Sequence, residues 1–222
     1  MSVAVALFAA GRGSRLGGDA AKPVLEWRGR PLLAWALDAA VASGCSPVLV
    51  TVGYRADDVR AAIAAPTPRA SDEYPPPAGE NRHLLVGGEG AMGVEVVENP
   101  AWEEGIAASL RAVLTVLEDR GDVTAVCVGL ADQPRVGPDA YRRLAAAHEA
   151  GAELAVATYD GRRGNPVLLA RSLWPQAMEL QGDAGARQLM LTHSVVEVPC
   201  EGTGHADDVD TLEDLGNLQE DQ

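Results

Sequence analysis

Continuously apolar runs alternate along the chain with stretches that have helical spacing. The apolar runs predict strands at 3–9, 47–52, 94–97, 123–129, 154–158, 167–169 and 195–198. Helical spacing predicts helices at 32–42, 56–65, 102–117, 138–150, 171–180, 184–191 and 211–218. Strands that are apolar throughout are typical of a parallel sheet covered on both faces. The pattern therefore predicts an α/β domain of three layers with a mostly parallel sheet.

One segment breaks this alternation. Residues 66–93 contain five prolines and five glycines, and this content of helix- and strand-breaking residues predicts a long flexible loop. The order of elements on either side of it shows no repeat. We therefore expect residues 1–222 to form a single domain that carries this loop.

Composition and charge exclude several classes of function. The net charge of -14 predicts repulsion from nucleic acid and from anionic membranes, and no apolar run is long enough to span a bilayer. Residues 1–30 are the exception, with five cations against two anions, among them Lys22, which is the chain's single lysine beside seventeen arginines. A small anion such as a phosphate would be attracted there. Cys45, Cys127 and Cys200 show no paired spacing, which favours a reducing cytoplasm.

The segment after the first predicted strand has the residues of a phosphate-binding loop. Glycines at 11, 13, 17 and 18 leave backbone N–H groups accessible to an oxyanion, while Ser14, Arg15 and Lys22 add a hydroxyl and two positive charges. The loop is neither a Walker A motif nor a GxGxxG fingerprint, because Asp19 follows Gly18 and Leu16 stands where the third glycine belongs. A plain glycine-rich turn with a surface lysine is the alternative.

Five segments together resemble a known family. Ala9-Ala10-Gly11 with Arg15-Leu16-Gly17 and Lys22-Pro23 is similar to the opening signature of the sugar-phosphate and cofactor nucleotidyltransferases. Within that superfamily the chain most resembles the MobA-like NTP transferases, and among them the molybdenum cofactor cytidylyltransferases. The supporting segments, in family order, are 99–110, 130–134, 161–167 and 182–187 followed by 208–215. The family's glycine-histidine-proline is Gly164-Asn165-Pro166 here.

The resemblance implies a Rossmann-like fold of the nucleotide-diphospho-sugar transferase type and a magnesium-dependent reaction. It implies catalytic roles for Arg15, Lys22 and Asp132. It also implies Mg²⁺ bound by Asp132 with Asp208 or Asp210. The nucleotide contacts are expected at Ala9, Ala10, Gly11, Gly13, Ser14, Arg15, Lys22, Gly53, Asn99, Gly105 and Ser109.

Some of these residues also fit a capping role. Asp132 could cap the segment that follows it, and Asp210, three residues before Glu213, suits the first turn of the last predicted helix. Capping does not require Asp208, which makes it the better ligand candidate of the two tail residues.

The resemblance favours CTP and molybdopterin as substrates, with pyrophosphate as the leaving product. The first alternative is another transferase of the same fold, whose acceptor is a sugar phosphate, a polyol phosphate or phospholactate. The second alternative is a chaperone that binds the cofactor and delivers it to a molybdenum enzyme, and the third is a redox enzyme.

Overall fold

The computed structural model describes residues 2–13, 20–65, 94–206, 209 and 214. Ser14, Arg15, Asp208, Asp210, the predicted loop at 66–93 and all but one residue of the predicted helix at 211–218 lie outside the described residues.

Within the described part of the chain, seven strands form one sheet in the order β5-β4-β1-β6-β8-β7-β9. Strands β5, β4, β1 and β6 run parallel to one another, and β7 pairs parallel with β9. Only β8 is antiparallel to both neighbours, so the predicted mostly parallel sheet is confirmed. The strand bounds are β1 Ser2–Phe8, β4 Val48–Val52, β5 Val94–Glu98, β6 Val123–Leu130, β7 Leu154–Tyr159, β8 Arg162–Ala170 and β9 Val196–Pro199.

Helices and a small hairpin complete the described fold. The α-helices are α1 Leu32–Ala42, α2 Ala56–Ala64, α3 Ile106–Glu118, α4 Pro138–Glu149 and α5 Trp174–Met178. Short 3₁₀ segments are η2 Lys22–Val24, η3 Trp102–Glu104, η4 Arg171–Leu173 and η5 Gly182–Leu191, and the hairpin joins β2 Glu26–Trp27 to β3 Arg30–Pro31.

Three predicted elements were wrong in extent. The single helix predicted at 102–117 is divided at Gly105, whose φ of 94° lies in the left-handed region and ends η3 before α3 begins. The helix predicted at 171–180 is a 3₁₀ turn followed by a five-residue α-helix. The strand predicted at 167–169 starts at Arg162, because its polar first residues pair with β7 in a hairpin that hydropathy does not reveal.

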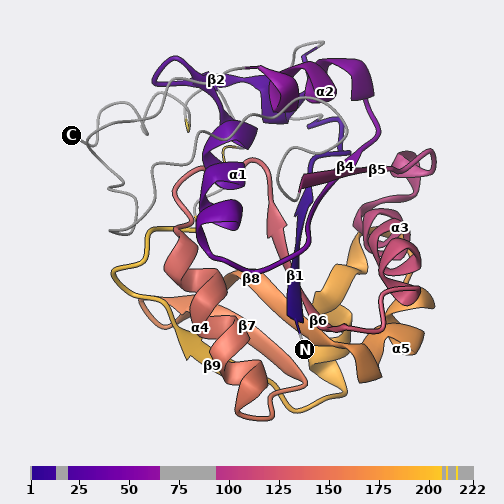
Figure 1. The fold of residues 1–222 in the computed structure, drawn as a ribbon, viewed down its shortest axis with the longest axis vertical. Coiled ribbons are helices and arrows are strands. Elements are labelled where there is room, and N and C mark those ends of the chain that lie inside the picture. The colour runs from indigo at the N-terminus through magenta and orange to yellow at the C-terminus, as the bar shows by residue number, and fades with distance from the viewer. Residues whose placement is uncertain (1, 14–19, 66–93, 207–208, 210–213, 215–222) are drawn as a thin grey trace.

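Side chains of alternate residues divide the core between the two faces of the sheet. On β1, Val5 and Leu7 join the cluster that packs under α1, α2 and α4, while Ala4 and Ala6 join the cluster under α3, α5 and η5. Figure 1 shows α1 and α4 on one side of the sheet and α3 and α5 on the other. A strand buried on both faces must be apolar at every position, which is the pattern the sequence displays.

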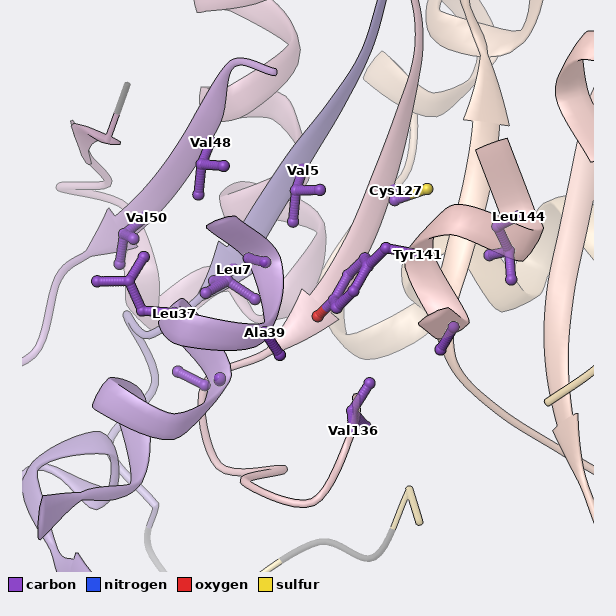
Figure 2. Packing of buried hydrophobic residues seen from close by; sticks show 14 of the residues in the cluster. Val5, Leu7, Leu37, Ala39, Val48, Val50, Cys127, Val136, Tyr141 and Leu144 are labelled. Carbon is purple, nitrogen blue, oxygen red and sulfur yellow. The ribbon is translucent and has the colours of Figure 1, made fainter. Parts of the chain in front are cut away.

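One close fit fixes α4 against the sheet. Tyr141 on α4 is 1% exposed, and a Cβ at Gly129 would lie 2.4 Å from its hydroxyl oxygen. Figure 2 shows the Tyr141 ring below Cys127 with its hydroxyl directed towards Ala39 and Leu7. Burial raises the pKa of Tyr141 far above its ordinary value, so this hydroxyl stays protonated. Glycine at position 129, one residue before the end of β6, is thus a packing requirement.

The cysteines do not form a reactive centre. All three are free thiols, and burial raises the pKa of Cys45, Cys127 and Cys200. A protonated thiol is a weak nucleophile, so none of them suits covalent catalysis at neutral pH. Among the described helices, none combines the length and the apolar character that a membrane span requires.

Candidate active site

Loops from the carboxyl ends of the parallel strands surround one hollow. In an open α/β sheet this edge is where ligands bind. The hollow has a volume of about 460 Å³ and takes its walls from the loop after β1, from η2, from the β5–α3 connection, and from the loop after β6. Its lining includes Ala9, Ala10, Gly11, Gly13, Lys22, Gly105, Ser109 and Asp132, all of which the sequence singled out.

The glycine loop is held by the neighbouring strand. The Ala9 amide donates to the Thr51 carbonyl at 3.2 Å, and the Tyr54 amide donates to the Ala10 carbonyl at 3.0 Å. Gly13 has a φ of 63°, and a Cβ there would lie 2.8 Å from Cβ of Lys22. Glycine is therefore required at this position both by its backbone conformation and by the close passage of the Lys22 side chain.

Lys22 and Asp132 meet in this hollow. Lys22 Nζ lies 2.5 Å from Asp132 Oδ2, with side-chain exposures of 8% and 18%. The lysine comes from η2 and the aspartate follows β6, so the fold joins residues 110 positions apart in the sequence. An ammonium group beside a carboxylate at the mouth of a glycine loop can hold a phosphate on one side and a cation on the other.

Asp132 retains capacity to bind a cation. Its Oδ1 atom is buried and has no hydrogen-bond partner among the described residues, which is costly for a carboxylate oxygen unless a ligand satisfies it. The capping alternative is wrong for α4, because the N-cap of that helix is Gly137. Magnesium is usually held by one or two carboxylates plus phosphate oxygens and water. The donor set therefore fits such an ion, although the described residues contain no group of three or more acidic, histidine or cysteine side chains placed to hold a metal.

Two predicted contact residues, Asn99 and Gly53, are not among the residues that line the hollow. Asn99 is 2% exposed, and its amide is used internally: Nδ2 donates to Ser109 Oγ at 3.0 Å, and Oδ1 accepts from the Ala101 amide at 3.1 Å. Gly53 is also absent from the lining, and a Cβ there would lie 2.6 Å from Cβ of Trp102. Both positions support the lining residues, because Asn99 is bonded to Ser109 and Gly53 packs on Trp102, and their contact with nucleotide stays a prediction.

Two wall residues, Arg12 and Asp183, were not among the predicted site residues. Arg12 lies 5.5 Å from the centre of the Tyr54 ring, and Tyr54 lies 5.3 Å from the Trp102 ring. Asp183 lines the hollow because Gly105 permits close approach: a Cβ at Gly105 would lie 2.6 Å from Asp183 Oδ1. The glycine-rich run at 182–187 was the available signal for this approach, although by itself it is a weak one.

A comparison with protein families identifies the domain that contains the glycine loop. The MobA-like NTP transferase domain matches residues 5–198. The chain belongs to the MobA-like NTP transferase family.

Individual relatives cover almost the whole chain. Nicotine blue oxidoreductase of Paenarthrobacter nicotinovorans is 29% identical over 96% of this chain and 94% of its own length. The crystal structure of Rv0371c from Mycobacterium tuberculosis H37Rv is 30% identical, covers 99% of this chain and 98% of that one, and has a TM-score of 0.75. A structure of Rv0371c in complex with manganese is 26% identical, covers 100% of both chains and has a TM-score of 0.72.

These similarities place the hollow within a MobA-like NTP transferase domain. The matched range includes the glycine loop, Lys22, Asp132 and the β7–β8 hairpin. It ends before Asp208 and Asp210, so their metal-binding roles stay predictions.

Proposed function

We propose that the protein transfers a nucleoside monophosphate from an NTP, with CTP favoured, to a phosphorylated acceptor, with molybdopterin favoured. An oxygen of the acceptor phosphate forms a bond to the α-phosphorus of the NTP, the bond from that phosphorus to the bridging oxygen breaks, and pyrophosphate leaves. The observation that carries this proposal is the 2.5 Å approach of Lys22 Nζ to Asp132 Oδ2 in a hollow lined by the glycine loop. Positioning and charge neutralisation supply most of the catalysis in such phosphorus chemistry.

Each part of the site has a role in this scheme. Backbone N–H groups of the glycine loop, with Lys22 and Arg15, would bind the triphosphate and stabilise the departing charge. Asp132 would hold Mg²⁺, with Asp208 or Asp210 as a further ligand, and the ion would neutralise phosphate charge when bound. The manganese complex of Rv0371c supports the use of a divalent ion by this chain. The Ala9-Ala10-Gly11 opening supports CTP, since the guanylyl-transferring branch has glycine as its second residue.

A second hollow suits the acceptor. It has a volume of about 470 Å³ and lies at the β7–β8 hairpin, with Arg162, Arg163 and His205 in its lining. Its wall is connected to the Asp132 loop, because Gln133 Nε2 donates to the Ala206 carbonyl at 3.0 Å and the His205 amide donates to the Arg135 carbonyl at 3.0 Å. Arg163 pairs with Glu197, whereas the Arg162 side chain has no polar or ring partner among the described residues. A guanidinium left available on an acidic protein supports binding of an anionic acceptor group.

Replacement of Arg162 by alanine should therefore weaken acceptor binding selectively. We expect the KM for the acceptor to rise about tenfold and the KM for CTP to stay within about twofold, since one charge-assisted hydrogen bond contributes on this scale. Steady-state pyrophosphate release measures both constants. Arg60→Ala on α2, a surface arginine paired with Asp57, is the matched control. Equal changes in the two KM values would contradict this assignment.

The nicotine blue oxidoreductase relative supports a second candidate function. That similarity covers nearly the full length of both chains, so an oxidoreductase acting on nicotine blue is the rival proposal. Transferases for sugar phosphates, polyol phosphates or phospholactate share the first mechanism and differ only in acceptor. A chaperone that delivers molybdenum cofactor to a molybdenum enzyme would bind cofactor without consuming NTP. The three free cysteines support a reducing cytoplasm as the setting for any of these.

A two-part assay separates these functions. Purified protein with Mg²⁺ is supplied with each of the four NTPs and with molybdopterin or each alternative acceptor, and pyrophosphate is measured. A parallel set measures oxidation of NADH and NADPH in the presence of nicotine blue. We expect pyrophosphate release with CTP and molybdopterin. Cofactor oxidation without pyrophosphate release would replace the transferase proposal by the oxidoreductase, and tight molybdopterin binding without either reaction would replace it by the chaperone.

A further inference from the structure

Val209 is fully buried although its sequence neighbours are acidic. It lies between Asp208 and Asp210 in the sequence, yet its own exposure is 0%. Its side chain belongs to a small cluster with Trp27 and Leu32, separate from the two large cores. A single valine buried in this way anchors the backbone that carries it.

The rest of this cluster belongs to the segment that follows Lys22. Leu25 and Trp35 pack against the cluster. The Leu25 amide donates to the Lys22 carbonyl at 3.1 Å, and the Leu32 amide donates to the Leu25 carbonyl at 2.9 Å. These bonds connect the turn that carries Lys22 to the residues packed around Val209, so a shift of the cluster would be transmitted to Lys22.

The backbone of Val209 makes the second connection. Its amide donates to the Asp132 carbonyl at 3.3 Å. One residue therefore contacts the supports of both members of the ion pair: its side chain packs on the Lys22 segment, and its amide binds the Asp132 loop. Because Lys22 and Asp132 are 110 positions apart in the sequence and lie on separate segments, a cross-connection of this kind supports their separation.

We infer that Val209 is a positioning residue that holds Lys22 and Asp132 at their working separation. It touches neither substrate nor the reacting atoms, and it acts through the two residues that do. Its importance for turnover rests on the proposed function, whereas its effect on the ion pair can be measured without any activity. Reacting groups displaced by about 1 Å lose on the order of a hundredfold in rate, so loss of this anchor should be visible in kcat.

The single lysine makes a direct readout available. Lys22 is the only lysine of the chain and is 7% exposed. Acetylation by an N-hydroxysuccinimide ester, followed by mass spectrometry of the peptide that contains Lys22, reports how well its amine is shielded. Val209→Ala should raise this acetylation rate at least tenfold. Val209→Ile keeps an apolar anchor and should stay close to wild type.

A matched control separates positioning from general loss of packing. Val113 on α3 is also 0% exposed but belongs to the core on the other face of the sheet, so Val113→Ala removes the same atoms elsewhere. We expect Val113→Ala to lower the melting temperature without changing the rate of Lys22 acetylation. If Val209→Ala is too unstable to purify, Val209→Thr replaces it and should show the same increase in acetylation.

Measurements of turnover then test whether Val209 affects catalysis. In pyrophosphate release, Val209→Ala should lower kcat ten- to a hundredfold with the KM for CTP within threefold, and Val209→Ile should restore kcat. Acetylation of Val209→Ala within twofold of wild type, or a kcat loss matched by Val113→Ala, would overturn the inference. If wild-type protein releases no pyrophosphate with any substrate pair, the proposed function fails, while the acetylation rates still decide the positioning role.

Discussion

Lys22→Ala is expected to lower kcat for pyrophosphate release by about 10²–10³-fold, which is the usual cost of removing one group that stabilises developing charge. The physical reason is the position of the ammonium, which is buried, 2.5 Å from Asp132 Oδ2 and beside Gly13 of the glycine loop. In the proposed reaction this ammonium, which lines the hollow, would neutralise charge on the departing pyrophosphate. The melting temperature should fall as well, because the mostly buried Asp132 carboxylate loses its ion-pair partner, so activity is compared well below the melting temperature of the variant.

Two further variants make this result specific. Arg28→Ala removes another positive charge from the same basic segment, but Arg28 is exposed and stacks on Trp27 outside the hollow, so its kcat should stay within about threefold of wild type. Lys22→Arg keeps the charge, yet the broad planar guanidinium is a poor substitute in the narrow space beside Gly13, and we expect an intermediate loss. Wild-type turnover in Lys22→Ala would contradict the assignment of the triphosphate to this loop.

Much of the fold could be predicted because strands buried on both faces must be apolar throughout. The strands predicted at 3–9 and 123–129 follow this pattern and correspond to β1 and β6, and the alternation of strands with helices predicts the mostly parallel sheet. The start of β8 could not be predicted, because Arg162 and Arg163 are exposed and polar and pair with β7 only through the backbone. The break between η3 and α3 depends on the left-handed conformation of Gly105, and glycine composition alone does not determine that conformation.

In the candidate site too, some features could be predicted from the sequence and others could not. Lys22 and Asp132 could be found because each follows an apolar strand or its loop in a recognisable motif. The resemblance implies a nucleotide contact for Asn99, but the sequence does not tell which partners its amide meets within the protein, and here they are Ser109 and Ala101. The anchoring role of Val209 was also beyond sequence analysis, since one valine among aspartates has no periodic signal.

Asp132→Asn is expected to have the largest effect of all, lowering kcat at least about 10³-fold, because it removes charge that both an ammonium and a divalent ion would use. Asparagine has nearly the same shape, so packing around the loop after β6 is preserved and loss of activity is attributable to charge. The buried Oδ1 atom, which has no hydrogen-bond partner among the described residues, is the atom we expect to face the metal.

Metal dependence is the sharper readout for this variant. For wild-type protein, removal of divalent ions with a chelator should abolish pyrophosphate release, and Mg²⁺ or Mn²⁺ should restore it. In Asp132→Asn, residual activity should require at least tenfold more Mg²⁺ for half its maximum, because loss of a ligand should cost no less than the roughly tenfold loss caused by mutating a residue that only supports a ligand. Asp139→Asn, which removes an exposed carboxylate at the start of α4, should leave the Mg²⁺ requirement unchanged. If Asp132→Asn lowered kcat with an unaltered Mg²⁺ requirement, Asp132 would act by orienting Lys22, and the metal would have to be held by other residues.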